Sequence, residues 1–183
     1  MVGRVKIGKY KSVFKGKFFR VEQASAVFPS GKKTIFERAI RPPSVVIFAF
    51  DSQKRILLTH EYRQKSGEYD WRVPGGRVDK EKNTRVAAQR ELREETGYRA
   101  KKMKRYIEKD RLGILDWKLV AFLATDLEYA PLEKDEDEDI SVHPKSLSIA
   151  YQMVLSGKIK NDFIATSILK LYRERKSVYR WLK

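Results

Sequence analysis

The sequence contains no cysteine, only two histidines and no long hydrophobic run. The absence of cysteine excludes disulfides, thiolate zinc centres, cysteine nucleophiles and iron–sulfur clusters. Any metal must therefore be held by oxygen atoms or by the isolated His60 and His143. The longest purely apolar run, residues 45–50, has six residues, whereas a membrane-spanning helix needs about 20. These absences predict a soluble globular protein in a cytoplasmic setting, with no membrane partner.

Acidic residues are also in short supply, because 40 Lys and Arg face 24 Asp and Glu and give a formal net charge of +16. Such a charge indicates an anionic partner, which is a phosphate-rich ligand, a nucleic acid or an acidic surface. Residues 126–139 depart from this trend with eight acids and one lysine. Charge alone leaves two interpretations of this segment open, a cation-binding loop and an ordinary solvated loop.

Hydrophobic alternation and turn residues predict a β-rich first third, with a tight turn at Pro29-Ser30-Gly31. Residues 64–70 are expected to form a loop. The expected strands are residues 18–27, 34–40, 44–50, 55–62, 98–107, 114–125 and 140–142. Residues 1–40 are therefore interpreted as a β element that precedes one domain, residues 41–183.

Three helices are expected in the remainder of the chain. The first begins at the N-cap Asn83 and ends at Gly97, a natural C′ residue. Pro144 is expected to open the second helix, which runs to about residue 155, because proline is favoured at the first helical position. The third spans roughly residues 162–175. The inner face of the first helix is expected to carry Val86, Ala87, Ala88 and Leu92.

The first helix also carries Glu91, Glu94 and Glu95. At 100° per residue, Glu91 and Glu95 lie one turn apart on the same side, with Glu94 beside them. Like charges at this spacing destabilise an isolated helix. A hard divalent cation such as Mg²⁺ removes the conflict, because it prefers carboxylate and water oxygens and bridges to substrate phosphates. Helical spacing alone is equally consistent with an ordinary surface helix rich in Glu and Arg.

The order of residues 76–98 resembles the Nudix box, the signature of hydrolases that act on nucleoside diphosphates linked to another moiety. The matching positions are Gly76 and the run Arg90-Glu91-Leu92-Arg93-Glu94-Glu95-Thr96-Gly97-Tyr98. One position departs from the box: Lys82 stands where the box has Glu, with Glu81 beside it. So many fixed residues over twenty-three positions make the match specific.

Motifs outside the box resemble the ADP-ribose pyrophosphatase branch of this family. They are His60-Glu61-Tyr62-Arg63, Val73-Pro74-Gly75-Gly76-Arg77-Val78-Asp79, the acidic residues 136–142 and the segment 156–161. Two positions differ from that branch, because Leu112 replaces a proline and Arg72 replaces an acidic residue. These differences bear on substrate choice more than on the type of reaction.

The resemblance implies an α/β fold, the Nudix α/β/α sandwich with a mixed sheet and an N-terminal antiparallel β element. In similar enzymes this N-terminal element is exchanged between the subunits of a homodimer, so residues 1–40 are expected to be a dimerisation arm.

The resemblance also implies roles for individual residues. The implied metal ligands are the carbonyl of Gly75, Glu91, Glu95 and Glu138. Glu138 is also the expected general base, Glu136 is its rival, and Glu94 is a supporting or additional ligand. Arg63 is the candidate for a diphosphate contact, because a planar guanidinium pairs bidentately with phosphate oxygens. A surface salt bridge at a strand end is the alternative interpretation of Arg63.

The expected reaction is Mg²⁺-dependent hydrolysis of the diphosphate bond of a small-molecule nucleotide, a nucleoside diphosphate sugar such as ADP-ribose, with Mn²⁺ as a substitute metal. With ADP-ribose the products are AMP and ribose 5-phosphate. Two alternatives remain open. One is an RNA 5′-end pyrophosphohydrolase, which the basic terminal segments favour although no RNA-binding motif is present. The other is a non-catalytic nucleotide-binding module whose box has decayed at Lys82.

Overall fold

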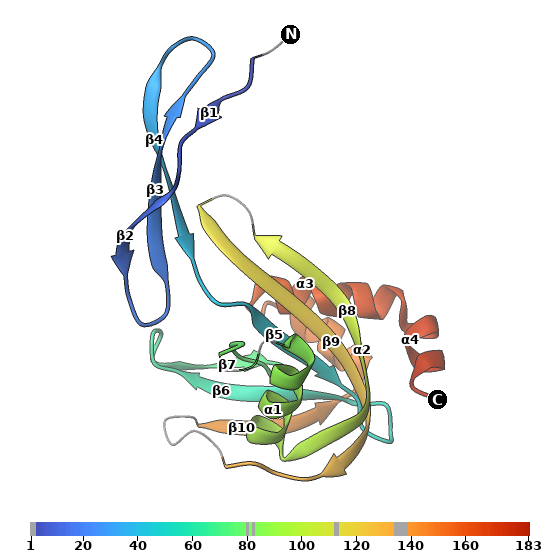
Figure 1. Ribbon diagram of the computed structural model, residues 1–183. Coiled ribbons are helices and arrows are strands. Elements are labelled where there is room, and N and C mark those ends of the chain that lie inside the picture. The colour runs from blue at the N-terminus through green and yellow to red at the C-terminus, as the bar shows by residue number, and fades with distance from the viewer. Residues whose placement is uncertain (1–2, 80, 82, 112–113, 134–138) are drawn as a thin grey trace. The chain divides into compact units, whose positions relative to one another are not determined.

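The computed structural model describes residues 3–79, 81, 83–111, 114–133 and 139–183 (Figure 1). The chain divides into two compact units. Unit 1 comprises Met1–Pro43 and Lys109–Leu119, and unit 2 comprises Ser44–Glu108 and Val120–Lys183. In the part of the chain that is described, no helix is both long and apolar enough to cross a lipid bilayer.

Unit 1 is built on antiparallel strands. β3 pairs with β4 along its whole length, and β1 and β2 pair with the other edge of β3. Ala39 and Ile40 of β4 pair in parallel with the first two residues of β9. The strands are β1 (Lys6–Ile7), β2 (Lys11–Lys15), β3 (Arg20–Val27), β4 (Lys33–Ile40) and β9 (Leu115–Tyr129). The expected antiparallel element at the N-terminus is confirmed, and β1 and β2 are additional to the expected strands.

The strands of unit 2 form two groups. In the first, β9 pairs with β5 and with β8, and in the second β6 lies between β7 and β10 in an antiparallel sheet. Every residue of β5 is buried, as its apolar sequence predicts. These strands are β5 (Ser44–Ala49), β6 (Ile56–Arg63), β7 (Glu68–Arg72), β8 (Tyr98–Arg111) and β10 (Ile140–Lys145). The expected loop at residues 64–70 is therefore wrong in its second half, which belongs to β7.

Helices contact both faces of β8 in unit 2. Met103 of β8 packs in a core cluster with side chains of α1. The neighbouring Lys102 instead donates a hydrogen bond to the carbonyl of Trp181 in α4, and Tyr106 donates to Glu174, between α3 and α4. The helices are α1 (Thr84–Thr96), α2 (Leu147–Leu155), α3 (Asp162–Arg173) and α4 (Arg175–Trp181). The expected mixed α/β sandwich is confirmed.

Three details of the predicted helices are wrong. Pro144 lies within β10 opposite Leu57, and α2 begins after Ser146, whose side chain accepts a hydrogen bond from the backbone N–H of Ile149. The last helix ends at Arg173 and is followed by α4. Val86 is 54% exposed, whereas the other three side chains expected on the inner face of α1 are buried.

Candidate active site

The ends of α1 are fixed by local hydrogen bonds, which set the direction of its glutamates. The Asn83 side chain accepts a hydrogen bond from the Arg85 backbone N–H at 2.8 Å. At the other end Gly97 has φ +78°, a conformation that favours glycine, and its N–H donates to the carbonyl of Arg93. Both caps are those expected from the sequence. The register of the helix therefore places Glu91 and Glu95 on its buried side.

Glu91 and Glu95 both face the glycine turn that follows β7. The Gly75 N–H donates to Glu95 Oε2 at 3.1 Å. A Cβ atom on Gly76 would lie 2.3 Å from Glu91 Oε1, so this carboxylate occupies the space that the missing side chain leaves. The two glutamates are only 8% and 4% exposed. The structure thus brings together three of the residues expected at the metal site.

The glycine turn is itself held by β5. Val45 N–H donates to the carbonyl of Gly76 and Ile47 N–H donates to the carbonyl of Pro74. Along the chain, the carbonyl of Gly75 therefore lies between two carbonyl groups that accept hydrogen bonds from β5. This pairing fixes the turn relative to the core, since β5 is fully buried.

Arg90 is the centre of a cluster of carboxylates on α1 and on the segment before it. Its guanidinium donates to Glu81 at 2.5 Å, to Glu94 at 2.5 Å and to Glu91 at 2.9 Å. Burial lowers the pKa of Arg90, but the hydrogen bond with Glu81 and the charge of Glu91 outweigh this effect and raise it above the usual value. The hydrogen bond from Arg90 in turn lowers the pKa of Glu81. Arg90 therefore relieves the repulsion between Glu91 and Glu94. The sequence analysis expected a metal ion to do this.

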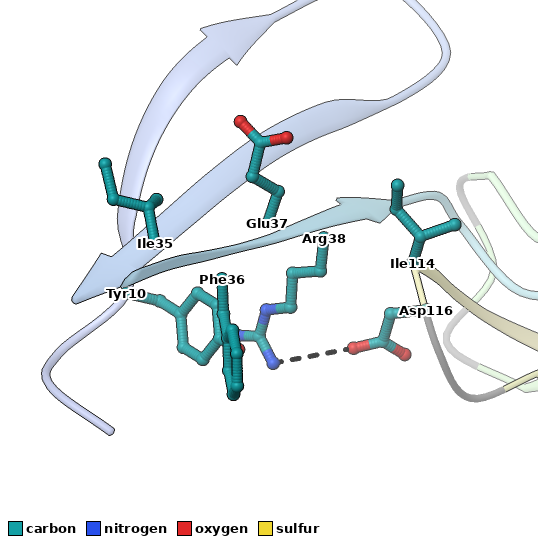
Figure 2. A pocket seen from close by; sticks show the side chains of 7 residues that line it. All are labelled: Tyr10, Ile35, Phe36, Glu37, Arg38, Ile114 and Asp116. Carbon is teal, nitrogen blue, oxygen red and sulfur yellow. Dashed lines mark ion pairs between the residues drawn. The ribbon is translucent and has the colours of Figure 1, made fainter. Parts of the chain in front are cut away.

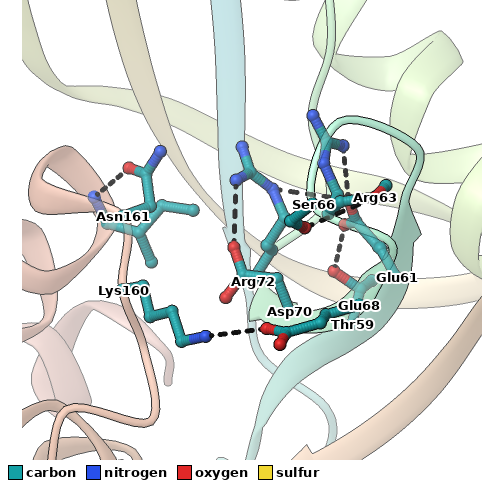
Figure 3. A network of polar contacts seen from close by, with 10 residues as sticks. Thr59, Glu61, Arg63, Ser66, Glu68, Asp70, Arg72, Lys160 and Asn161 are labelled. Atoms are coloured by element: carbon teal, nitrogen blue, oxygen red, sulfur yellow. Dashed lines mark hydrogen bonds and ion pairs between the residues drawn. The ribbon is translucent and has the colours of Figure 1, made fainter.

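A second polar cluster surrounds Glu61 on β6 (Figure 3). Glu61 is 6% exposed and accepts a hydrogen bond from the Thr59 hydroxyl at 2.6 Å. Arg63 and Arg72 both approach Glu61 Oε2, each at 3.3 Å, and Arg72 also pairs with Asp70 at 3.5 Å. Burial raises the pKa of Glu61 above its ordinary value. The salt bridge that the alternative interpretation of Arg63 expected is thus present, but its partner is buried.

The Glu61 cluster lies on the side of its sheet that faces α1. Side chains alternate along a strand, so Thr59, Glu61 and Arg63 share a face with Leu57. Leu57 packs in the same core cluster as the buried residues of α1. The pairing of Glu61 with Arg72 was not predicted from the sequence, because their contact depends on the register between β6 and β7.

The profile of the NUDIX domain family matches residues 40–157. The chain belongs to the Nudix family. A solved Nudix-like fold, titled "Crystal structure of ADP compounds hydrolase", superposes with a TM-score of 0.81 at 24% identity, covering 98% of this chain and 97% of that one. The match shows that the folds are the same.

Characterised relatives align over most of this Nudix chain. It is 30% identical over 161 residues to a CMP-5′-(N-acetyl-N-hydroxy-3-aminopropyl)phosphonate hydrolase of Streptomyces rubellomurinus, covering 86% of this chain and 77% of the relative. It is 28% identical over 161 residues to an ADP-ribose pyrophosphatase of Bacillus subtilis, covering 86% and 87%. A shorter match, 42% over 55 residues, links it to an RNA pyrophosphohydrolase of Caulobacter vibrioides and covers 30% and 31%. The chain is a Nudix hydrolase that resembles the ADP-ribose pyrophosphatase branch.

Nudix hydrolases generally use divalent metal ions, and the donor set beside the glycine turn suits one. Carboxylate and carbonyl oxygens are the ligands that hard divalent cations prefer. Glu91 and Glu95 offer such oxygens from one turn of α1, next to the backbone of Gly75. Among the described residues, no three His, Asp or Glu side chains converge as a metal centre. The expected ligand Glu138, its neighbour Glu136, and Lys82 lie outside the described residues.

Proposed function

We propose that this Nudix hydrolase cleaves the diphosphate bond of a nucleoside diphosphate sugar in a Mg²⁺-dependent reaction, with ADP-ribose as the substrate. Water and ADP-ribose would give AMP and ribose 5-phosphate. The observation that carries this proposal is the placement of two buried carboxylates, Glu91 and Glu95, against the Gly75–Gly76 turn. The likeness to an ADP-ribose pyrophosphatase over 86% of the chain supports the choice of substrate.

In this proposal the metal ligands are Glu91, Glu95 and the Gly75 carbonyl, with Glu138 as a further ligand. When bound, Mg²⁺, or Mn²⁺ in its place, supplies charge neutralisation for the diphosphate and lowers the pKa of a bound water. Glu94, which Arg90 holds at 2.5 Å, supports this group from the neighbouring position of α1. The hydrogen bond from Gly75 N–H keeps Glu95 aimed at the turn before any ligand enters.

The chain's own groups would position the substrate and move the proton. The Arg63 side chain is 49% exposed and pairs with Glu61 through one nitrogen. In this proposal its other donors would bind the diphosphate. Arg72 keeps Glu61 paired when Arg63 turns to the substrate. Glu138 would accept the proton of the attacking water, with Glu136 as its rival for that role.

A homodimer is part of the same proposal, because unit 1 exposes apolar side chains. Ile35 is 62% exposed and Ile114 is 71% exposed, and both line a cavity of about 470 Å³ (Figure 2). Within this cavity Arg38 lies 4.0 Å from the Tyr10 ring and 3.8 Å from Asp116. Exposed apolar surface next to a rigid charged group favours an interface between subunits.

One observation supports a second candidate, an RNA 5′-end pyrophosphohydrolase, which is the local 42% identity to such an enzyme. A substrate screen distinguishes the two. The protein is incubated with Mg²⁺ and, separately, ADP-ribose, GDP-mannose, diadenosine polyphosphates and 5′-triphosphorylated RNA, and the products are separated by ion-exchange chromatography. We expect AMP from ADP-ribose as the fastest reaction. Preferential release of pyrophosphate from RNA would support the second candidate, and no hydrolysis of any compound would support a non-catalytic module.

A further inference from the structure

The C-terminal helix α4 presents a basic surface to solvent. Its one buried residue is Val178, which is 4% exposed. Lys176 and Arg180 lie two residues before and after it, and each is rotated about 160° away from Val178 at 100° per residue. Both side chains are exposed. The outward side of α4 is therefore cationic.

Two lysines of β8 lie against Trp181, at the C-terminal end of one flank of α4. The ammonium groups of Lys102 and Lys104 lie 5.0 Å and 4.4 Å from the centre of the Trp181 ring, and Lys102 also donates to the Trp181 carbonyl at 2.7 Å. At the start of α4, the Arg175 guanidinium lies 4.6 Å from the ring of Tyr172 in α3. These cation–π contacts hold the charges in place, so less side-chain entropy is lost when they bind an anion.

Acidic residues are scarce in the two segments that carry these cations. The segments 98–107 and 170–183 contain eleven Lys and Arg and one acid, Glu174. Glu174 is already bound by Lys170 and by the Tyr106 hydroxyl. Among the described residues, no ion pair joins a carboxylate to Lys102, Lys104, Arg175, Lys176 or Arg180. An excess of positive charge at this place attracts a polyanion, whose charges are close together.

We infer that these five residues, Lys102, Lys104, Arg175, Lys176 and Arg180, form a binding surface for single-stranded nucleic acid, here named the α4 basic face. Its cations would contact successive phosphates. The rings of Tyr179 and Trp181 on α4 are half-buried and offer edges and faces on which bases stack. This function goes beyond diphosphate hydrolysis and does not depend on it.

Two observations favour nucleic acid over an anionic membrane as the partner. A membrane-surface helix inserts an exposed apolar face into the headgroup region. α4 has seven residues, and its apolar residue Val178 is turned inward.

The α4 basic face is also separate from the Nudix glutamates. Lys102 and Lys104 flank Met103, which packs in the core cluster with α1 on the opposite face of β8.

Fluorescence anisotropy with a 15-nucleotide single-stranded RNA tests this inference. The RNA carries a 5′-fluorescein and no 5′ di- or triphosphate, so hydrolysis at its end does not affect the signal. The full chain is titrated at several NaCl concentrations. For the wild type we expect salt-sensitive binding with a slope of roughly −3.5 in log K against log salt, from about 0.7 per phosphate and five contacts.

The double variant Lys176→Gln/Arg180→Gln should bind about tenfold more weakly at low salt, with a slope reduced by about 1.4. Its matched control is Lys32→Gln/Lys33→Gln, which removes the same charge from exposed positions of unit 1 and should bind as the wild type does. Melting curves check that both variants are folded. Equal weakening in both variants would contradict a localised surface, as would salt-insensitive binding. Tighter binding to vesicles with 30% phosphatidylserine than to RNA would also overturn the inference.

Discussion

At the scale of single residues, Arg63 is the side chain whose chemistry distinguishes diphosphate binding from a purely structural role. Arg63→Lys keeps the positive charge but loses the planar fork that binds two phosphate oxygens. We expect KM for ADP-ribose to rise about tenfold with kcat nearly unchanged, because ground-state binding is lost. Arg85→Lys, at an exposed position of α1, is the control. An unchanged KM would mean that Arg63 serves only as an ion-pair partner for Glu61.

Glu81 supplies a prediction about pH. Its pKa is lowered by the hydrogen bond from Arg90, so the stability it contributes is fully present above the unfolded pKa near 4.3 and is lost as pH falls through the folded value. Glu81→Gln should therefore be less stable than the wild type at pH 7, by about 1–2 kcal/mol. The difference should be smaller at pH 3 than at pH 7. Thermal unfolding at both pH values measures it, and a gap that grows in acid would contradict the pairing.

The candidate site could be predicted from the sequence only where its residues share one local element. Glu91 and Glu95 follow from helical spacing, and both lie where that spacing places them. The contact of Arg90 with Glu94 joins residues one helical turn apart, whereas its contact with Glu81 crosses the turn before α1. The pairing of Arg72 with Glu61 depends on the register of two strands, which the sequence does not specify.

At the scale of elements, the two glycines of the turn after β7 have separable roles. The three atoms nearest to a Cβ on Gly76 all belong to the carboxylate of Glu91, which is the flexible end of a side chain. A Cβ on Gly75 would instead lie 2.3 Å from the backbone oxygen of Val45. Gly76→Ala should therefore keep a near-normal Tm and lose activity about tenfold or more, because the Glu91 carboxylate must move. Gly75→Ala should lower the Tm clearly.

Melting curves and initial rates on both variants test this difference. The same Tm loss in both variants would mean that the turn is only a packing element. A fully active Gly76→Ala variant would mean that the position of the Glu91 carboxylate does not matter for the reaction.

The elements that were predicted correctly have strong local signals, and those that were missed do not. α1 has a capping residue at each end, and β5 is a short apolar run. Pro144 suggests a helix start from local preference, but β10 lies at the edge of its sheet, where a proline is tolerated. The first part of β7 was expected to be a loop because three of the five residues of this strand are charged. Its pairing with β6 outweighs this weak local tendency.

At the scale of the whole molecule, the exposed apolar residues of unit 1 predict self-association. Light scattering after size exclusion should give twice the 21.5 kDa of one chain. The double variant Ile35→Glu/Ile114→Glu places charges on this surface and should give the mass of one chain. Glu substitutions at exposed positions of α2, Ile149 and Leu155, serve as the control and should leave the dimer intact. A wild-type protein with the mass of one chain would contradict the proposed homodimer.

The most direct test of the proposed function is the hydrolysis of ADP-ribose by the wild type and by Glu95→Gln at saturating Mg²⁺. Glutamine keeps the shape of the side chain and can still accept the Gly75 N–H, but it removes the charge, so the fold should survive and the rate should fall by about 100-fold or more. We expect the wild type to release AMP and ribose 5-phosphate in equal amounts and to stop when EDTA is added. A wild type that does not cleave ADP-ribose, or a Glu95→Gln variant that cleaves it at the wild-type rate, would contradict the proposed function.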